Sequence, residues 1–104
     1  MAQAAINMHS SQISHGIVMP DSYAGVGNLA LVTGYTPSMI KVIVLENDLD
    51  PIAYYAWYST DPDNIYTGNG VQDSFVTVTA TGFVVDMTAV AVLHQAADAL
   101  IWET

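Results

Sequence analysis

Three histidines are the first candidates for metal or acid–base chemistry in this 104-residue chain. His9 and His15 are six residues apart, which fits neither the i, i+4 pair of a helical zinc site nor a zinc finger. On a strand they would share one face but stand about 20 Å apart, too far to hold one ion. His94 stands alone where an apolar stretch becomes polar. We therefore expect no metal site and no cofactor.

Serine and carboxylate residues raise the question of hydrolytic or calcium chemistry. A serine hydrolase needs its nucleophile on a strained turn, and the chain has no Gly-x-Ser-x-Gly segment. The pairs Asp48/Asp50 and Asp61/Asp63 could act as acid and base or collect Ca²⁺. Both pairs stand in turn-like sequence, where Asp is favoured because its side chain bonds the local backbone. We predict turn roles for them, and a chain that is not an enzyme.

Four aromatic residues in one segment are candidates for contact with another molecule: Tyr54, Tyr55, Trp57 and Tyr58. On a strand, Tyr55 and Trp57 point to one side and Tyr54 and Tyr58 to the other. We expect one set in the core and the other at an interface, because Tyr and Trp dominate interface energetics. The alternatives are that both sets are buried, or that the aromatic face binds a sugar.

Composition and charge restrict the partners. Hydrophobic residues make up 52% and charged residues 11% of the chain, which excludes intrinsic disorder. One Lys+Arg against ten Asp+Glu gives a net charge of −9, which argues against nucleic acid and anionic membranes as partners. No Cys is present, so there is no disulfide framework. So few charges cannot cover a small domain, and we expect other subunits to bury part of its surface.

From residue 29 onward the pattern predicts one all-β domain, an antiparallel β-sandwich or barrel over 29–104. Residues 74–81 alternate apolar and polar side chains, as a half-buried strand does. Residues 87–93 are compatible with helix or strand, and Val90 and Val92 favour strand. The expected strands are 29–32, 39–45, 52–58, 74–81, 83–85, 87–93 and 99–103, with polar turns at 47–51, 61–64 and 68–70.

Residues 1–28 are predicted to form an extended N-terminal arm with one short strand at 16–19. The segment is rich in Ala, Ser, Gln, Gly and Asn and has no apolar stripe at helical spacing. Its alternative is a first strand of the domain's own sheet. Candidates for arm contacts with a neighbouring subunit are its apolar residues Ile6, Met8, Ile13, Ile17 and Met19.

Three segments of the domain carry a family resemblance. They are Gly34-Tyr35-Thr36-Pro37 with the following Met39-Ile40-Lys41-Val42-Ile43, Thr81-Gly82-Phe83-Val84-Val85, and Leu100-Ile101-Trp102-Glu103. Together they resemble small β-rich virion proteins of tailed bacteriophages, over roughly residues 29–104. The resemblance implies a non-enzymatic protein of the head or tail, for instance a capsid decoration (cement) protein, and such proteins commonly form trimers.

The function expected from these observations is structural. We expect a homo-oligomer, with a trimer favoured, that is made in the host cytoplasm and binds the major capsid protein or another virion protein on the capsid exterior through residues 1–28. The alternative is a carbohydrate- or receptor-binding module of a phage tail or head fibre, using Tyr54 or Tyr55 with Trp57 and the Asp48/Asp50 turn. A small hydrolase is disfavoured because the nucleophile motif is missing.

Overall fold

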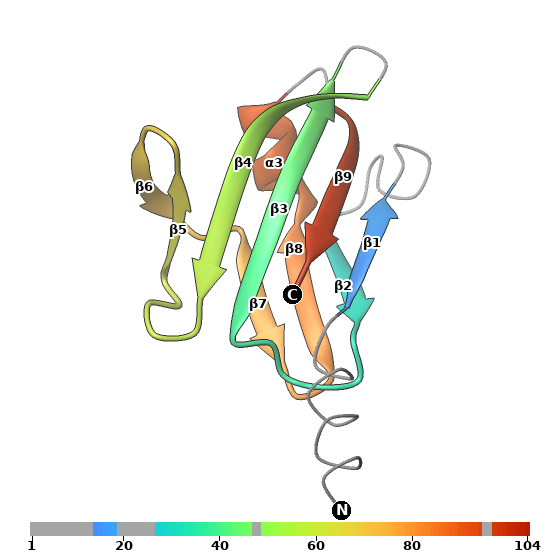
Figure 1. The fold of residues 1–104 in the computed structure, drawn as a ribbon, viewed down its shortest axis with the longest axis vertical. Helices are drawn as coiled ribbons and strands as arrows, with labels where there is room; N and C mark the ends of the chain where they lie inside the picture. Colours follow the sequence, from blue (N-terminus) through green and yellow to red (C-terminus); the bar gives the residue numbers. More distant parts are fainter. Residues whose placement is uncertain (1–13, 19–26, 47–48, 95–96) are drawn as a thin grey trace, which may run out of the picture.

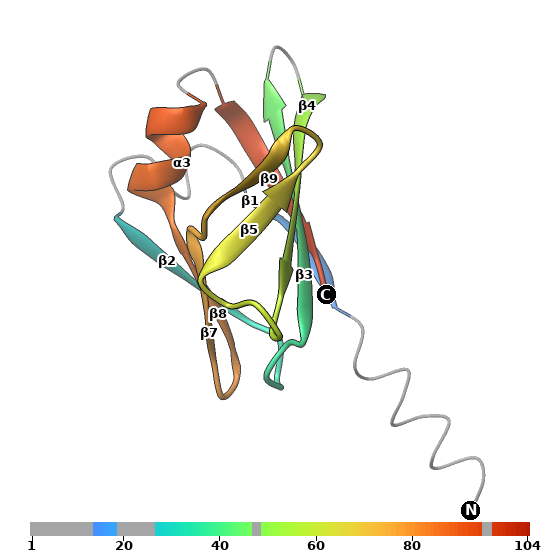
Figure 2. The ribbon, with the colours of Figure 1, turned by 90° about the vertical axis from the view of Figure 1, so that its left-hand side faces the viewer.

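A computed structural model describes residues 14–18, 27–46, 49–94 and 97–104. Two antiparallel β-sheets face each other, and one short helix lies at one end of the smaller sheet (Figures 1 and 2). The predicted β-sandwich is confirmed.

The larger sheet has six strands in the order β1-β9-β3-β4-β5-β6, and the smaller has three in the order β2-β8-β7. Every strand pair in the described ranges is antiparallel. Some neighbours are distant in sequence; β9, for example, lies between β1 and β3. The strand bounds in chain order are β1 His15–Val18, β2 Asn28–Val32, β3 Met39–Glu46, β4 Asp50–Tyr58, β5 Asn64–Thr67, β6 Gly70–Asp73, β7 Val76–Thr79, β8 Gly82–Asp86 and β9 Ala97–Glu103.

The core lies between the two sheets and follows from side-chain alternation along the strands. On β3 the fully buried Ile40, Val42 and Val44 are two residues apart and therefore share one face. Trp102 of β9 and Phe83 of β8 meet across the layers, with ring centroids 5.3 Å apart in an edge-to-face arrangement. Apolar side chains buried between the sheets therefore hold the two sheets together.

β1 confirms the strand predicted at 16–19, within one residue, and shows where it belongs. It pairs with β9, Ile17 opposite Ile101 and Val18 opposite Leu100, and Val18 is buried. The domain's own sheet, which was the alternative to a free arm, is therefore the correct interpretation for residues 15–18. The arm candidates Ile6, Met8, Ile13 and Met19 lie outside the described residues.

The strand predicted at 87–93 is wrong, because the segment is helix α3, Met87–Leu93. Asp86 caps its N-terminus: the carboxylate accepts hydrogen bonds from the backbone N–H groups of Thr88 (3.1 Å) and Ala89 (3.2 Å). Met87 and Val90, three residues apart, are buried, whereas Val92 is 71% exposed. A helical cap and spacing therefore outweigh the strand preference of the valines.

Other strand boundaries differ from prediction, because some residues predicted in strands lie in turns and some predicted in turns lie in strands. The strand predicted at 74–81 is shorter in the structure, where it is β7. Val76 is buried and Thr77 and Thr79 are exposed, as the alternation predicted. The strand does not extend further because the Ser74 hydroxyl accepts a hydrogen bond from the Val76 N–H and Ala80 lies in a turn. Asp50 and Pro51, expected in a turn, begin β4. The β5–β6 hairpin was not predicted as strands; only turns at 61–64 and 68–70 were expected in this region.

No helix in the described ranges is long and apolar enough to span a membrane.

Candidate functional site

The outer face of the six-stranded sheet, turned away from the smaller sheet, carries an unbroken row of apolar side chains. The register aligns Ile17 of β1 with Ile101 of β9, Ile101 with Ile43 of β3, and Ile43 with Tyr54 of β4. We call these four residues the apolar row. Ile17 is 53% and Tyr54 59% exposed, while Ile43 and Ile101 are partly shielded by their neighbours. The row therefore presents a continuous apolar surface across four strands.

The adjacent row of the same face contains the only cation of the chain. Lys41 is exposed and stands opposite Glu103 on β9 and Ala56 on β4. The row continues through Tyr66 of β5 to Val71 of β6, both exposed. The charges of Lys41 and Glu103 therefore cancel in the middle of this face, although the whole chain has a net charge of −9.

The four predicted aromatic contacts divide as strand alternation required. Tyr55 and Trp57 are buried, and the Trp57 indole N–H donates to the Pro62 carbonyl at 3.0 Å. These two residues therefore belong to the core of the domain. Tyr54 and Tyr58 are exposed on the outer face, and the Tyr58 ring meets Tyr66 edge-to-face with centroids 5.8 Å apart.

The Asp61/Asp63 segment is a turn, as predicted. The Asp61 carboxylate accepts from the side-chain amide of Asn64 at 3.1 Å and from the Tyr66 hydroxyl. That hydrogen bond to Asp61 raises the pKa of Tyr66 above its usual value, because it stabilises the protonated phenol. Among the described residues no three His, Cys, Asp or Glu side chains gather as a metal site. Asp48 and His9 lie outside the described residues.

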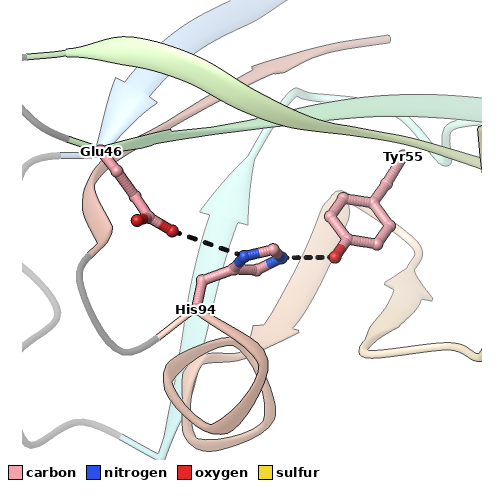
Figure 3. Close-up of polar contacts among 3 residues, drawn as sticks. All are labelled: Glu46, Tyr55 and His94. Carbon is pink, nitrogen blue, oxygen red and sulfur yellow. Dashed lines mark hydrogen bonds and ion pairs between the residues drawn. The ribbon is translucent and has the colours of Figure 1, made fainter.

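A second polar feature joins Glu46 at the end of β3, Tyr55 on β4 and His94 after α3 (Figure 3). The His94 Nε2 is 2.5 Å from the Tyr55 hydroxyl, and its Nδ1 is 3.7 Å from a Glu46 carboxylate oxygen. The hydroxyl can donate to a neutral imidazole or accept from a protonated one, so this contact survives either state. The protonated form would also pair with Glu46.

Packing fixes the Tyr55 end of this contact. The Tyr55 ring meets Phe75 edge-to-face at 5.0 Å, and burial raises the pKa of the Tyr55 phenol. His94 is also the C-terminal cap of α3, where its backbone N–H donates to the Val90 carbonyl at 2.8 Å. The group therefore fastens the helix end to the larger sheet. Sequence spacing does not reveal this group, because Tyr55 and His94 are separated by 39 residues.

Comparison of the chain with protein-family models, with curated proteins and with solved structures finds no match. Function must therefore be inferred from the residues themselves. Two features bear on it: the apolar row on the outer face, and the polar contacts around His94.

Proposed function

We propose that this chain is a non-enzymatic structural protein that assembles through the outer face of its six-stranded sheet, as a decoration protein on the exterior of a tailed-phage capsid. The observation that carries the assembly proposal is the apolar row. The resemblance of three segments to phage virion proteins supports the capsid setting and the preference for a trimer.

The apolar row is unusual for an antiparallel sheet with one face open. Such a sheet normally alternates apolar residues toward the core with polar residues toward water. β7 of the smaller sheet follows this rule, with Thr77 and Thr79 exposed. The larger sheet instead places Ile17 and Tyr54 in the open, next to the half-buried Ile43 and Ile101. Covering such a surface with another protein is favourable, by about 25 cal/mol for each Å² removed from water.

Electrostatics favour the same face for contact between copies of the chain. Two chains of net charge −9 repel each other, and the repulsion is weakest where local charges cancel. Lys41 stands opposite Glu103 in the middle of the outer face, so their charges cancel there, whereas Asp73 shares this face with Val71 at the edge strand β6. Ile17, the one arm candidate in the described residues, belongs to the apolar row.

The test compares two exposed apolar strand residues. Tyr54→Glu places a carboxylate in the apolar row, and the matched control Val32→Glu places one at a 76% exposed position of β2. Native mass spectrometry and sedimentation velocity of the full chain should show an oligomer that Tyr54→Glu abolishes and Val32→Glu retains, with unchanged circular dichroism. A monomeric parent chain at high concentration, or equal loss in both variants, would refute assembly through this face.

The capsid setting is tested by cosedimentation with purified capsids of the virus that encodes the chain. Deletion of residues 1–13 spares β1, which a longer deletion would remove from its sheet. We expect the deletion variant to keep its β-sheet circular dichroism and to lose capsid binding. Full binding by this variant would remove the proposed role of the N-terminal segment, and an absence of binding by the parent chain would refute the capsid proposal.

A further inference from the structure

The larger sheet opens between β4 and the β5–β6 hairpin. β5 pairs with β4 only from Tyr55 to Trp57, although β4 begins at Asp50. In the described structure, Pro51, Ala53 and Tyr54 therefore have strand partners only on β3. Figure 1 shows the hairpin diverging from β4 along this stretch. A hollow of about 490 Å³ results, lined by Ile52, Ala53, Tyr54, Tyr55, Thr67, Gly68, Asn69, Gln72 and His94.

The lining of this hollow combines polar and apolar side chains and contains no Lys, Arg, Asp or Glu. Asn69 and Gln72 offer amide groups that can both donate and accept hydrogen bonds. The unpaired edge of β4 adds backbone N–H and C=O groups of the same dual character. Exposed apolar surface from Tyr54 and Ile52 borders them. Polar groups of both kinds beside an aromatic ring match a molecule with many hydroxyl groups and apolar C–H faces.

We propose that this hollow is a binding site for a neutral saccharide. An anion would find no Lys or Arg in the lining and would be repelled by the net charge of −9. A cation would find no carboxylate there, because Glu46 lies behind His94 and faces its Nδ1 (Figure 3). The volume lies within the roughly 300–1,000 Å³ typical of small-molecule sites.

The contact between His94 and Tyr55 prepares this site for its ligand. Nε2 of His94 is held by the Tyr55 hydroxyl, and Tyr55 is in turn held by Phe75. The imidazole that borders the hollow therefore has one orientation before a ligand arrives, which lowers the entropy lost on binding. The site differs from the sugar site expected from sequence, because the buried Trp57 takes no part and the hairpin residues Asn69 and Gln72 do.

This inference is independent of assembly through the apolar row, and its test avoids Tyr54, which belongs to both features. Gln72→Ala removes an amide from the hollow. Val71→Ala is the matched control, because Val71 lies next to Gln72 on β6 but aligns with Tyr66 in the outer-face row. The probes are the methyl glycosides of glucose, galactose, mannose and N-acetylglucosamine, added at millimolar concentration to the ¹⁵N-labelled full chain.

The expected result is a set of amide chemical-shift changes at residues 52–54, 67–72 and 94 with at least one glycoside. Gln72→Ala should weaken that binding about three- to tenfold, as loss of one hydrogen bond does, and Val71→Ala should leave it unchanged. No shift with any glycoside overturns the inference. Equal weakening in both variants, or binding of inorganic phosphate or a short neutral peptide at these residues in place of the glycosides, overturns it as well.

Discussion

The substitution Gly16→Ala tests how β1 is attached to the larger sheet. A Cβ atom at Gly16 would lie 2.8–2.9 Å from three atoms of the Trp102 ring, where ordinary contacts are 3.4–4 Å. Trp102 is buried and rests against Phe83, which is 1% exposed, so the ring has no free space to enter. The four-residue edge strand β1 yields more easily than this pair of rings, and we expect it to separate from β9.

The magnitude follows from what β1 buries. Separation exposes Val18, which is 5% exposed in the folded chain, and burial of a valine is worth about 1.5–3 kcal/mol. Retaining β1 against the displaced ring would cost about 1–3 kcal/mol through overpacking, so both routes lead to a similar loss. We expect Gly16→Ala to lower the free energy of unfolding by about 2 kcal/mol, which corresponds to about 30-fold faster exchange of the β1 amide protons.

Urea unfolding followed by tryptophan fluorescence, together with hydrogen exchange, measures both quantities. Gly68→Ala is the control, because a Cβ there meets no atom within 4 Å and its expected effect is below about 0.5 kcal/mol. If Gly16→Ala is as stable as the parent and its β1 amides are equally protected, β1 does not lie against Trp102 and the reasoning is wrong.

Three further substitutions test the helix cap, the buried phenol and the β2–β8 contact. Asp86→Ala should lower the free energy of unfolding by about 1 kcal/mol, because two helix N–H groups lose their acceptor. An unchanged midpoint of thermal unfolding would contradict the cap. Burial raises the Tyr55 pKa, so above pH 10 the unfolded chain loses this proton before the folded chain does and stability falls as pH rises. Tyr55→Phe should make the urea midpoint less sensitive to pH between 9 and 11, and identical pH slopes would count against this cause. Gly82→Ala should cost more than about 3 kcal/mol, because its Cβ would lie 2.0 Å from the Leu31 carbonyl oxygen; near-parent stability in urea would contradict this approach of β8 to β2.

The strands predicted most closely from the sequence are those rich in β-branched or aromatic residues. β3 and β4 agree with prediction within two residues, and the separation of Tyr54 and Tyr58 from Tyr55 and Trp57 follows from alternation alone. Local chemistry also identified the turn at 61–64, where the Asp61 side chain bonds its neighbours. Such features depend on contacts within a few residues, and sequence alone contains that information.

The remaining features depend on contacts that sequence spacing does not reveal. Val90 and Val92 favour strand at 87–93, but the cap at Asp86 and the burial of Met87 and Val90 make this segment helix α3. The apolar row exists only because the register aligns Ile17 with residues of β9, β3 and β4. The His94 contacts likewise require α3 to end beside β4.

The position of Lys41 gives the chain a built-in reporter of its own unfolding. Trypsin cleaves after Lys or Arg, and this sequence has only Lys41. Although its side chain is exposed, its backbone belongs to β3, which is hydrogen-bonded to β4 on one side and to β9 on the other. Trypsin cannot bind and cleave that peptide bond until β3 separates from its sheet. The rate of the single tryptic cut therefore follows the opening of the whole domain and not the fraying of its edges.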